Sequence, residues 1–398
     1  MKAKELLDIV SAGETSKVQF KQEMDDDKLA AEMIAMSNSK GGIILVGVKD
    51  KTGEILGLTY EQLQSYNNRL ANVANDKIKP QIFISTEVVI ITSEMGDKKI
   101  LVIYINEGKN KPYKDNSGTI WLKQGADKRK LVDNNEIMRL FQQSANLFVD
   151  EIEVYDTTIE DIDERMFADY FRKEFKVSYQ EKGLTYEQAL RAKRVLRNDK
   201  VSLAGLLFFG KEPQNIKPAF TIKTVSYFGN RIEGNWYRNK PEDSKGTIPE
   251  LFKQGMSFLR SNLRHTQQGQ NFNSIGILEI PETVLIELLQ NALIHRDYFK
   301  NAPIRILIFD DRVEIVSPGK LPNSLTTEEI KYGNTVIRNN QIAMFATHTL
   351  PYSGLGSGIK RALAEQPNIE LINDIEGEQF IVKIPRPAEE LLAQSPLS

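Results

Sequence analysis

The segment Glu287-Leu-Leu-Gln-Asn291-Ala-Leu-Ile-His295-Arg-Asp-Tyr298 places Glu287, Asn291 and His295 four residues apart among leucines and isoleucines. Residues four apart stack on one face of an α-helix. The spacing therefore predicts a helix with a polar stripe that is bordered by apolar side chains. A carboxylate, a carboxamide and an imidazole in this arrangement can hold a metal-bound phosphate and a water molecule.

The composition is that of an ordinary globular protein, and it argues against several kinds of site. The chain has 398 residues, of which 40% are hydrophobic and 27% charged, and this length allows two or three domains with their own cores. Without cysteine it has no disulfide framework and no thiolate zinc site. Only three histidines are present, His265, His295 and His348, which argues against a multi-histidine metal site.

Hydropathy and charge limit the possible partners. The first residues lack the apolar core of a secretion signal, and no apolar run approaches the length of a membrane span. We therefore expect a soluble, cytoplasmic protein without a membrane partner. The net charge of −2 argues against a chain held to nucleic acid by bulk charge alone, so nucleic-acid binding would need a local basic face.

Apolar periodicity and turn signals predict an α+β fold in three segments. The first segment, residues 1–147, is expected to form one domain. Its predicted helices cover 25–39, 60–78 and 134–143, and its predicted strands cover 43–48, 87–92, 99–105 and 118–123.

The other two segments are residues 148–270, an α/β connecting segment, and residues 271–398, an α/β module. In the connecting segment, helices are predicted over 164–174 and 185–196 and strands over 204–209 and 219–227. In the last segment, helices are predicted over 281–294 and from 354 onward, and strands over 304–309, 313–316 and 379–384.

Two further elements of the last segment suit a phosphate ligand. Ser317-Pro-Gly319-Lys-Leu-Pro322 is a tight turn after a strand, and Gly354-Leu-Gly356-Ser-Gly358-Ile-Lys-Arg361 is a glycine-rich loop that opens a cationic helix. Glycines let backbone N–H groups approach and cradle phosphates, and a helix N-terminus favours their negative charge.

The order of these elements resembles the RecG-related, divergent branch of the GHKL ATPases. The matching residues read E-x-x-x-N-A-x-x-H-R-D-Y, then D-R-V-E-I-x-S-P-G-x-L-P, then R-N, then G-x-G-x-G. GHKL proteins such as gyrase B, Hsp90, histidine kinases and MutL share an adenine-nucleotide pocket, the Bergerat fold. The resemblance therefore implies a Bergerat-like α/β sandwich over residues 271–398.

The resemblance also implies ATP and Mg²⁺ as cofactors and assigns roles to the motif residues. Asn291 would ligate Mg²⁺, and Glu287 would be the base that orients water in a weak ATPase. Gly319 would line the adenine side. The phosphate lid would consist of Gly354, Gly356 and Gly358.

The chain departs from the GHKL pattern at one position. GHKL enzymes place an aspartate before the glycine of the second element, where it reads the adenine amino group, whereas this chain has Ser317-Pro318. Nucleotide binding is therefore better supported than hydrolysis, and His295 is expected to be hydrogen-bonded structure rather than a catalyst. No chemical role follows from the sequence for Asp311, Arg312, Arg338 and Asn339, which also match.

The first segment resembles the AlbA-like, Schlafen-type domain, which implies nucleic-acid binding. The resemblance covers nearly all of residues 1–147. It rests on Glu14-Thr-Ser-Lys-Val-Gln19-Phe20-Lys21, Asn38-Ser-Lys-Gly41-Gly42-Ile-Ile-Leu-Val-Gly47-Val-Lys49-Asp50, Lys111-Pro-Tyr113 and Trp121-Leu-Lys-Gln-Gly125.

Schlafen-type nucleases carry an acidic cluster that this chain only partly reproduces. Their first motif reads E-x-x-x-x-E-F-K, and its two glutamates join an aspartate beyond the G-V strand to hold Mg²⁺ or Mn²⁺. Here Glu14 matches, Asp50 lies near the aspartate position, and Gln19 replaces the second glutamate. Neutral glutamine cannot supply the missing charge, so Glu14 and Asp50 are interpreted as nuclease remnants.

Basic residues beside these motifs are expected to contact phosphates. Lysines on flexible stems suit phosphate contact and register rather than base reading. Tyr113 and Trp121 could stack a base, although a tryptophan on a strand is more often part of the core. The predicted nucleic-acid-binding residues are Lys21, Lys111, Lys123, Lys128, Arg129 and Lys130.

Three functions remain open from the sequence. The combined architecture resembles bacterial and archaeal proteins described as transcriptional regulators, which favours an ATP-binding regulator that engages DNA or RNA. The first alternative is a Mn²⁺-dependent ribonuclease that acts on structured RNA, for example in phage defence. The second is a non-catalytic scaffold that uses both modules for homo-oligomer contacts.

Overall fold

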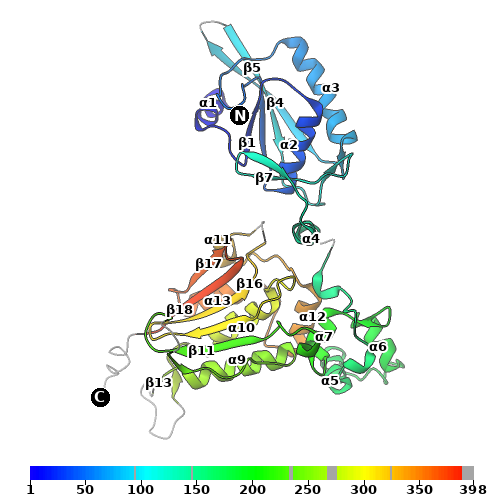
Figure 1. The fold of residues 1–398 in the computed structure, drawn as a ribbon, viewed down its shortest axis with the longest axis vertical. Helices are drawn as coiled ribbons and strands as arrows, with labels where there is room; N and C mark the ends of the chain where they lie inside the picture. The colour runs from blue at the N-terminus through cyan, green and yellow to red at the C-terminus, as the bar shows by residue number, and fades with distance from the viewer. Residues whose placement is uncertain (94–95, 145–146, 233–235, 267–275, 323–324, 388–398) are drawn as a thin grey trace. The chain divides into compact units, whose positions relative to one another are not determined.

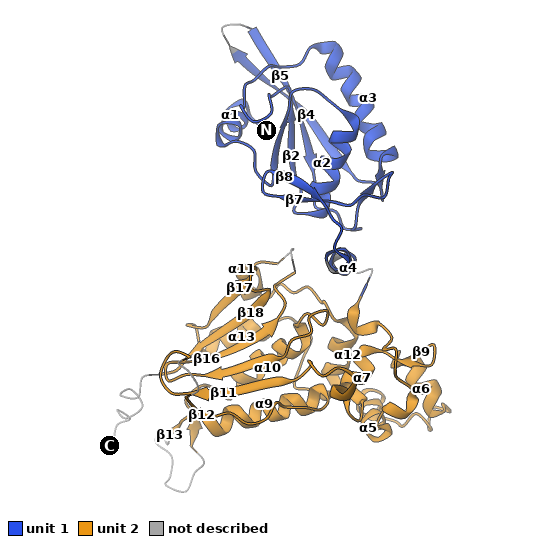
Figure 2. Cartoon of the chain, in the orientation of Figure 1, with its two compact units in different colours: residues 1–147 blue, residues 148–398 orange. Residues whose placement is uncertain are grey.

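The computed structural model describes residues 1–93, 96–144, 147–232, 236–266, 276–322 and 325–387. Their contacts divide the chain into two compact units, Met1–Leu147 and Phe148–Ser398 (Figure 2). Each unit is α+β and has its own sheet and core, which confirms the predicted fold class (Figure 1). Within the described ranges, no helix has both the length and the apolar character needed to cross a membrane.

The first unit combines a central sheet with helices on both of its faces (Figure 1). Its helices are α1 (Ala3–Ala12), α2 (Asp26–Asn38), α3 (Tyr60–Asp76) and α4 (Asn134–Gln143). Its strands are β1 (Val18–Lys21), β2 (Gly42–Val46), β3 (Ile78–Lys79), β4 (Ile84–Ser93), β5 (Gly96–Ile105), β6 (Lys114–Asp115), β7 (Trp121–Gln124) and β8 (Asp127–Lys130).

Strand β2 lies inside the four-stranded sheet, whose order is β1-β2-β5-β4. It pairs in parallel with β1 and antiparallel with β5. Successive side chains point to opposite faces, so Ile44 and Val46 pack with α2 and α3, whereas Leu45 packs with α1. Burial on both faces explains why this strand has a continuous apolar sequence.

The second unit is built around a larger sheet with helices on one face (Figure 1). Two 3-10 helices, Val149–Glu151 and Ile159–Asp161, open it. Its helices are α5 (Glu164–Phe175), α6 (Tyr186–Ala192), α7 (Leu203–Phe209), α8 (Pro213–Ile216), α9 (Ile248–Asn262), α10 (Glu282–His295), α11 (Thr327–Lys331), α12 (Asn340–Thr349) and α13 (Gly358–Glu365). Its strands are β9 (Leu196–Arg197), β10 (Lys200–Val201), β11 (Ile222–Tyr227), β12 (Tyr237–Asn239), β13 (His265–Thr266), β14 (Ile277–Leu278), β15 (Ile304–Ile308), β16 (Arg312–Pro318), β17 (Glu370–Asp374) and β18 (Gln379–Pro385).

The six-stranded sheet of this unit has the order β12-β11-β15-β16-β18-β17. Only the pair of β11 and β15 is parallel among the described strands of this sheet. Because β11 precedes residue 270 and β15 follows it, one sheet takes strands from both the connecting segment and the last segment. Ile304, Ile306 and Ile308 on β15 are buried against α9 and α10, while Arg305 is exposed.

Helix α10 ends inside the unit, where the Asn339 side chain forms hydrogen bonds with carbonyl groups at its C-terminus. The Asn339 side chain is buried, and its Nδ2 donates to the carbonyl oxygens of Ile294 and Arg296 at 2.8 and 2.9 Å. Carbonyl groups at a helix C-terminus have no hydrogen-bond donor within the helix. When the helix end is buried, a side chain such as Asn339 must supply that donor. The motif residue Asn339 therefore has a structural role.

At the start of α12, the free backbone N–H groups form hydrogen bonds with a buried carboxylate from the beginning of the unit. Oδ2 of Asp150 accepts the backbone N–H groups of Gln341 and Ile342 at 2.7 and 2.9 Å. Burial raises the pKa of Asp150 to about 6, against the lowering effect of these two hydrogen bonds. This contact ties Val149–Glu151 to the helix that follows Asn339.

One predicted strand is wrong: residues 204–209 belong to helix α7. The Oγ atom of Ser202 accepts the N–H of Gly205 at 3.1 Å and caps the helix. All residues of α7 are buried, so the sequence lacks the one-sided apolar period that marks a surface helix. The predicted helix over 185–196 is also shorter, because α6 ends at Ala192.

The remaining predicted elements are confirmed to within a few residues. The helices α2, α3, α4, α5 and α10 and the strands β2, β4, β5, β15, β16 and β18 all occur where the periodicity placed them. Helices α9 and α12 and strand β17 were not predicted.

Removing the cap on α10 should destabilise the second unit. Asn339→Ala leaves the carbonyl groups of Ile294 and Arg296 buried without a donor, which costs about 1–3 kcal/mol of unfolding free energy. Chemical denaturation would measure this loss. The matched control is Asn340→Ala, at an exposed neighbouring position, and equal stability of the two variants would contradict the capping role.

Candidate functional site

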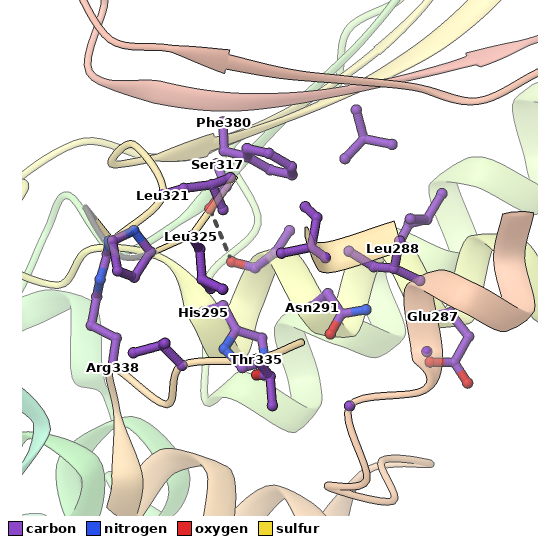
Figure 3. Close-up of a pocket in the computed structure, with 18 of the residues that line it drawn as sticks. Glu287, Leu288, Asn291, His295, Ser317, Leu321, Leu325, Thr335, Arg338 and Phe380 are labelled. Carbon is purple, nitrogen blue, oxygen red and sulfur yellow. Dashed lines mark hydrogen bonds between the residues drawn. The ribbon is translucent and has the colours of Figure 1, made fainter. Parts of the chain in front are cut away.

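A pocket in the second unit brings together the three motif elements of the last segment (Figure 3). It contains about 1040 Å³ of empty space, part of it open to solvent. Its walls come from α10, from β16 and the turn after it, from the loop before α13, and from β18. Among the lining residues are Glu287, Leu288, Asn291, His295, Ser317, Gly319, Leu321, Arg338, Tyr352, Gly356, Gly358 and Phe380.

The stripe on α10 forms one wall of this pocket. Glu287, Asn291 and His295 all line it, as their spacing predicted. The Nδ2 atom of Asn291 is buried and has no hydrogen-bond partner. A buried amide without a partner is costly, so this carboxamide is suited to a ligand that completes its hydrogen bonding.

Gly358, the first residue of α13, lies directly against the stripe. A Cβ atom at this position would lie 2.3 Å from Oε2 of Glu287 and 3.2 Å from Nδ2 of Asn291. A side chain at this position would therefore displace the Glu287 carboxylate and the Asn291 amide from their present positions. Gly356 also lines the pocket, whereas Gly354 lies in the same loop but is not among the lining residues.

Ser317 and Gly319 form the opposite side of the pocket. The Ser317 side chain is buried, and its Oγ donates to the carbonyl oxygen of Ala292 at 3.1 Å (Figure 3). Because the hydroxyl proton is donated to Ala292, the Ser317 oxygen can act towards a ligand only as a hydrogen-bond acceptor. Gly319 has a φ of +98°, and a Cβ there would lie 2.2 Å from Cβ of Asp297, so the turn needs glycine.

His295 is a neutral member of the stripe. Burial and the nearby positive charge of Arg338 lower the pKa of His295 from 6.5 to about 4. Its Nε2 lies 3.4 Å from the hydroxyl oxygen of Tyr352. This environment agrees with a structural rather than a catalytic histidine.

The motif residues without a predicted role have structural contacts. Arg338 lines the pocket, and its Nη2 donates to the carbonyl oxygen of Lys320 at 2.7 Å. Arg312 pairs with Asp311 and Glu314 and lies over the ring of Phe309, 4.1 Å from its centroid. Arg338 is therefore at the site, whereas Asp311 and Arg312 form contacts at the start of strand β16.

The charge of the lining favours an anion. Its ionisable side chains are Glu287, His295, Lys320, Arg338 and Tyr352. Burial raises the pKa of Tyr352, so the phenol is neutral, and the imidazole is neutral as well near pH 7. Two cations therefore face one carboxylate.

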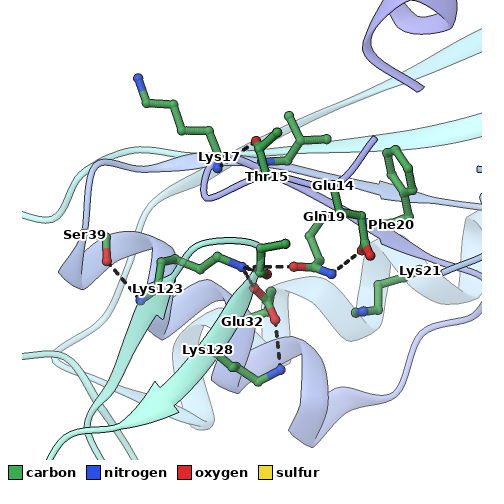
Figure 4. Close-up of polar contacts among 12 residues, drawn as sticks. Glu14, Thr15, Lys17, Gln19, Phe20, Lys21, Glu32, Ser39, Lys123 and Lys128 are labelled. Carbon is green, nitrogen blue, oxygen red and sulfur yellow. Dashed lines mark hydrogen bonds and ion pairs between the residues drawn. The ribbon is translucent and has the colours of Figure 1, made fainter. Parts of the chain in front are cut away.

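In the first unit, the Schlafen-type motif forms a buried polar network (Figure 4). Oε1 of Glu14 accepts hydrogen bonds from the Gln19 side chain and from the N–H of Phe20. Oε1 of Gln19 accepts from Nζ of Lys123 at 2.9 Å, and the same ammonium lies 2.6 Å from Oε1 of Glu32. A lysine ammonium thus lies among oxygen atoms beside the acidic motif.

Asp50, the other proposed nuclease remnant, is not part of this network. Its Oδ2 pairs with Nζ of Lys21 at 2.9 Å, and its Oδ1 accepts the N–H of Gln22. Across the part of the chain that the structure describes, no group of three or more His, Cys, Asp or Glu side chains could hold a metal ion. The side chains of Glu14 and Asp50 are therefore engaged with the protein itself.

For two of the lysines, the prediction of phosphate binding is wrong. Lys111 and Lys123 are buried, and their ammonium groups are used internally, by Glu107 and by Glu32 respectively. Burial also lowers the pKa of Lys111. They are therefore not part of an exposed basic surface.

The other four predicted cations are at least partly accessible. Lys21 pairs with Asp50, Lys128 with Glu32, and Arg129 with Glu136. Lys130 is exposed and lies over the ring of Trp121, 5.4 Å from its centroid. The short hairpin β7–β8 therefore carries three neighbouring cations, Lys128, Arg129 and Lys130.

Sequence reasoning missed Glu32 and the contact that Arg361 makes with Glu287. Glu32 lies on α2 between apolar residues and is 2% exposed. A charged residue on the buried face of a predicted helix is a signal that could have revealed it. The ion pair of Arg361 and Glu287 joins residues far apart in the sequence, and no local pattern indicates it.

Family models match three parts of the chain. Residues 14–132 match the model described as "Schlafen, AlbA_2". Residues 301–376 match the model for the C-terminal region of the ATP-dependent DNA helicase RecG, and residues 138–222 match a domain of unknown function, DUF8451. The chain combines a Schlafen-type domain with a RecG-related ATPase-like module. These matches confirm the two resemblances that the sequence showed. The two domains indicate nucleic-acid-related and ATP-related functions.

The RecG-related match includes Gly319, Gly354, Gly356 and Gly358 and begins after the stripe on α10. An ATPase-like module is compatible with ATP and Mg²⁺ as ligands. A comparison with curated proteins found no match. Among solved structures, the DIP2311 protein from Corynebacterium diphtheriae is 22% identical over 98% of this chain and 81% of that chain, with a TM-score of 0.46.

The low pKa of His295 should be visible in a titration. Between pH 6.5 and about 4, the unfolded chain binds a proton at this imidazole that the folded chain excludes, so the unfolding free energy falls as the pH falls through this window. In NMR spectra of histidine-labelled protein, the resonance that disappears in His295→Gln should titrate with a midpoint near pH 4. A midpoint near 6.5 would contradict a buried, neutral imidazole.

The Lys123 ammonium should be essential to the fold of the first unit. Lys123→Met leaves the carboxylate of Glu32 buried with only Lys128 as a partner, and breaking such a buried pair costs roughly 3 kcal/mol of unfolding free energy. Denaturant unfolding would measure the loss. Lys17→Met is the matched control, because the Lys17 side chain is exposed.

Adding Glu32→Gln to Lys123→Met removes the buried charge that has lost one of its two partners and should restore part of the stability. If Lys123→Met were as stable as Lys17→Met, the ammonium would contribute nothing to the core.

Proposed function

We propose that the protein is a nucleotide-responsive regulator that binds DNA or RNA. In this proposal, an adenine nucleotide with Mg²⁺ occupies the pocket of the second unit and changes the affinity of the first unit for nucleic acid. Transcription is the process that such a regulator would control.

The observation that carries the nucleotide proposal is the buried, unpartnered Nδ2 of Asn291. It lies where α10 meets the first residue of α13, in a pocket with net positive lining and large apolar walls. Ligand pockets typically combine apolar walls with a few convergent polar groups. A nucleotide has the matching parts, since its base is flat and largely apolar and its phosphates are anionic.

The residues present fit a magnesium nucleotide. Asn291 is the residue that would hold Mg²⁺ through its side-chain oxygen, and the ion, when bound, neutralises phosphate charge. The backbone of Gly356 and Gly358 would face the phosphates, because glycine permits close approach, whereas Gly354 lies in the same loop outside the lining. These assignments extend the motif match to the pocket geometry.

Ser317 supports an adenine base despite the missing aspartate. Its hydroxyl oxygen keeps acceptor capacity after donating to Ala292. An acceptor at this place suits the amino group of adenine and disfavours the carbonyl oxygen of guanine. Gly319 then lines the same side of the base.

Binding is favoured over hydrolysis because of the contacts of Glu287. Its two carboxylate oxygens contact Arg361 and Gln290. A base must have hydrogen-bond access to the water that it activates. In this arrangement the protein is a nucleotide sensor, and any ATPase activity would require Glu287 to leave these partners.

In the first unit, the β7–β8 hairpin supports nucleic-acid contact. Lys128, Arg129 and Lys130 follow one another on β8, and phosphate contacts by such cations are independent of sequence. The ribonuclease alternative is less well supported, because the Lys123 ammonium lies between Gln19 and Glu32 beside the acidic motif.

Reciprocal linkage provides the test of this proposal. If nucleotide changes nucleic-acid affinity, nucleic acid changes nucleotide affinity by the same factor, typically about 5–150-fold. The affinity of the full chain for single-stranded and double-stranded DNA and RNA should shift when ATP and Mg²⁺ are added. Fluorescence anisotropy with labelled oligonucleotides would measure the shift.

Asn291→Ala should abolish both the binding of ATP with Mg²⁺ and this shift. Asn340→Ala, at an exposed position outside the pocket, should keep them. Equal nucleic-acid affinity with and without ATP would overturn the regulatory part of the proposal. Absence of ATP binding by the unmodified protein would overturn the nucleotide part.

A further inference from the structure

The carboxylate of Glu287 lines the pocket and is held by two partners. Its Oε1 forms an ion pair with the Arg361 guanidinium, and its Oε2 accepts from Nε2 of Gln290 at 2.8 Å. The Glu287 side chain is 11% exposed, whereas that of Arg361 is 49% exposed. One member of the pair is thus buried in the pocket wall, and the other is accessible from solvent.

This ion pair joins two helices at the wall of the pocket. Arg361 belongs to α13, and Glu287 belongs to α10. Gly358, at the start of α13, lies so close to the same carboxylate and to the Asn291 amide that a Cβ atom there would displace them. The pair therefore fixes α13 over the residue proposed to hold Mg²⁺.

Arg361 is also placed to serve a phosphate. Its Nη1 lies 3.2 Å from Oγ of Ser357, the residue at the N-cap of α13. Through this contact the guanidinium lies at the positive end of α13, next to the lining residues Gly358 and Ile359, although Arg361 is not itself among the lining residues. Guanidinium groups bind phosphates through two parallel hydrogen bonds.

We propose that the Glu287–Arg361 ion pair is a latch that a nucleoside triphosphate opens. The terminal phosphate replaces the Glu287 carboxylate as the ion-pair partner of the Arg361 guanidinium. The carboxylate that is released can then accept a hydrogen bond from water. The inference rests on the proposed nucleotide function and adds that the site distinguishes triphosphate from diphosphate.

The physical basis of the exchange is a difference in charge and exposure. Arg361 is half exposed, so its bond to a single carboxylate is weakened by competing water. A terminal phosphate carries more negative charge and more acceptor oxygens than a carboxylate. A diphosphate lacks this group and leaves the pair intact.

The test compares ATP and ADP binding by calorimetry in the full chain with Mg²⁺ present. Arg361→Ala should weaken ATP binding about tenfold, which corresponds to about 1.4 kcal/mol, while ADP binding changes less than about twofold. Arg361→Lys should be intermediate, because an ammonium is a point charge without a planar fork. Lys360→Ala, an exposed cation on the same helix, is the matched control and should leave both affinities unchanged.

A double-mutant cycle separates the latch from simple charge repulsion. Glu287→Gln releases Arg361 in advance and should tighten ATP binding, and most of that gain should disappear in the Arg361→Ala background. An equal gain in both backgrounds would show that Glu287 only repels phosphate and would overturn the latch. Equal losses of ATP and ADP affinity in Arg361→Ala would overturn it as well.

The outcomes also distinguish this inference from the function on which it rests. If the unmodified protein binds neither ATP nor ADP, the proposed nucleotide function fails, and the latch fails with it. If the unmodified protein binds ATP and Arg361→Ala binds it equally well, only the latch is wrong. Thermal unfolding of each variant shows whether a loss reflects folding instead, and Arg361→Lys then provides the comparison with a retained charge.

Discussion

The second unit depends on the packing of α10 between the sheet and the neighbouring helices. Leu285 and Leu289 bury this helix against the sheet and α9, and the polar stripe lines the pocket beside Leu288. Each polar group on the stripe must find a partner from another element or from a ligand. Glu287 finds Arg361 and Gln290, whereas the Asn291 amide finds none. The site is therefore a consequence of how the helix is buried.

Local pattern was sufficient to predict the stripe and most elements of both sheets, because helix and strand periods are properties of short segments. It failed at α7, whose residues are buried on every side, so that neither period appears. It also failed where a partner is remote in sequence. Asn339 and Asp150 each satisfy a helix end far along the chain, and motif matching could show that Asn339 is characteristic but not that it caps α10.

The first unit shows a related limit, because the sequence does not reveal which charged side chains are buried. Lys111 and Lys123 were predicted to be surface cations beside a nucleic-acid-binding motif, but their ammonium groups are buried and pair with Glu107 and Glu32. The substitution of Gln19 for glutamate explains part of this arrangement. A second carboxylate at that position would add an anion next to Glu14, whereas the neutral amide both donates to Glu14 and accepts from Lys123. The amide thus links an anion to a cation.

Coupling between a nucleotide pocket and a separate unit requires an element with two arrangements, not only a chain of contacts. The contacts exist within the second unit: Arg338 lines the pocket, the adjacent Asn339 caps α10, and Asp150 holds the start of α12. Asp150 lies close to the beginning of this unit, so its position is tied covalently to the segment that leads from the first unit. In the proposed mechanism, the Glu287–Arg361 pair is the element that changes, since it joins α13 to the middle of α10. Asn339 holds the C-terminal end of the same helix, so α10 links the proposed latch to the segment that Asp150 holds.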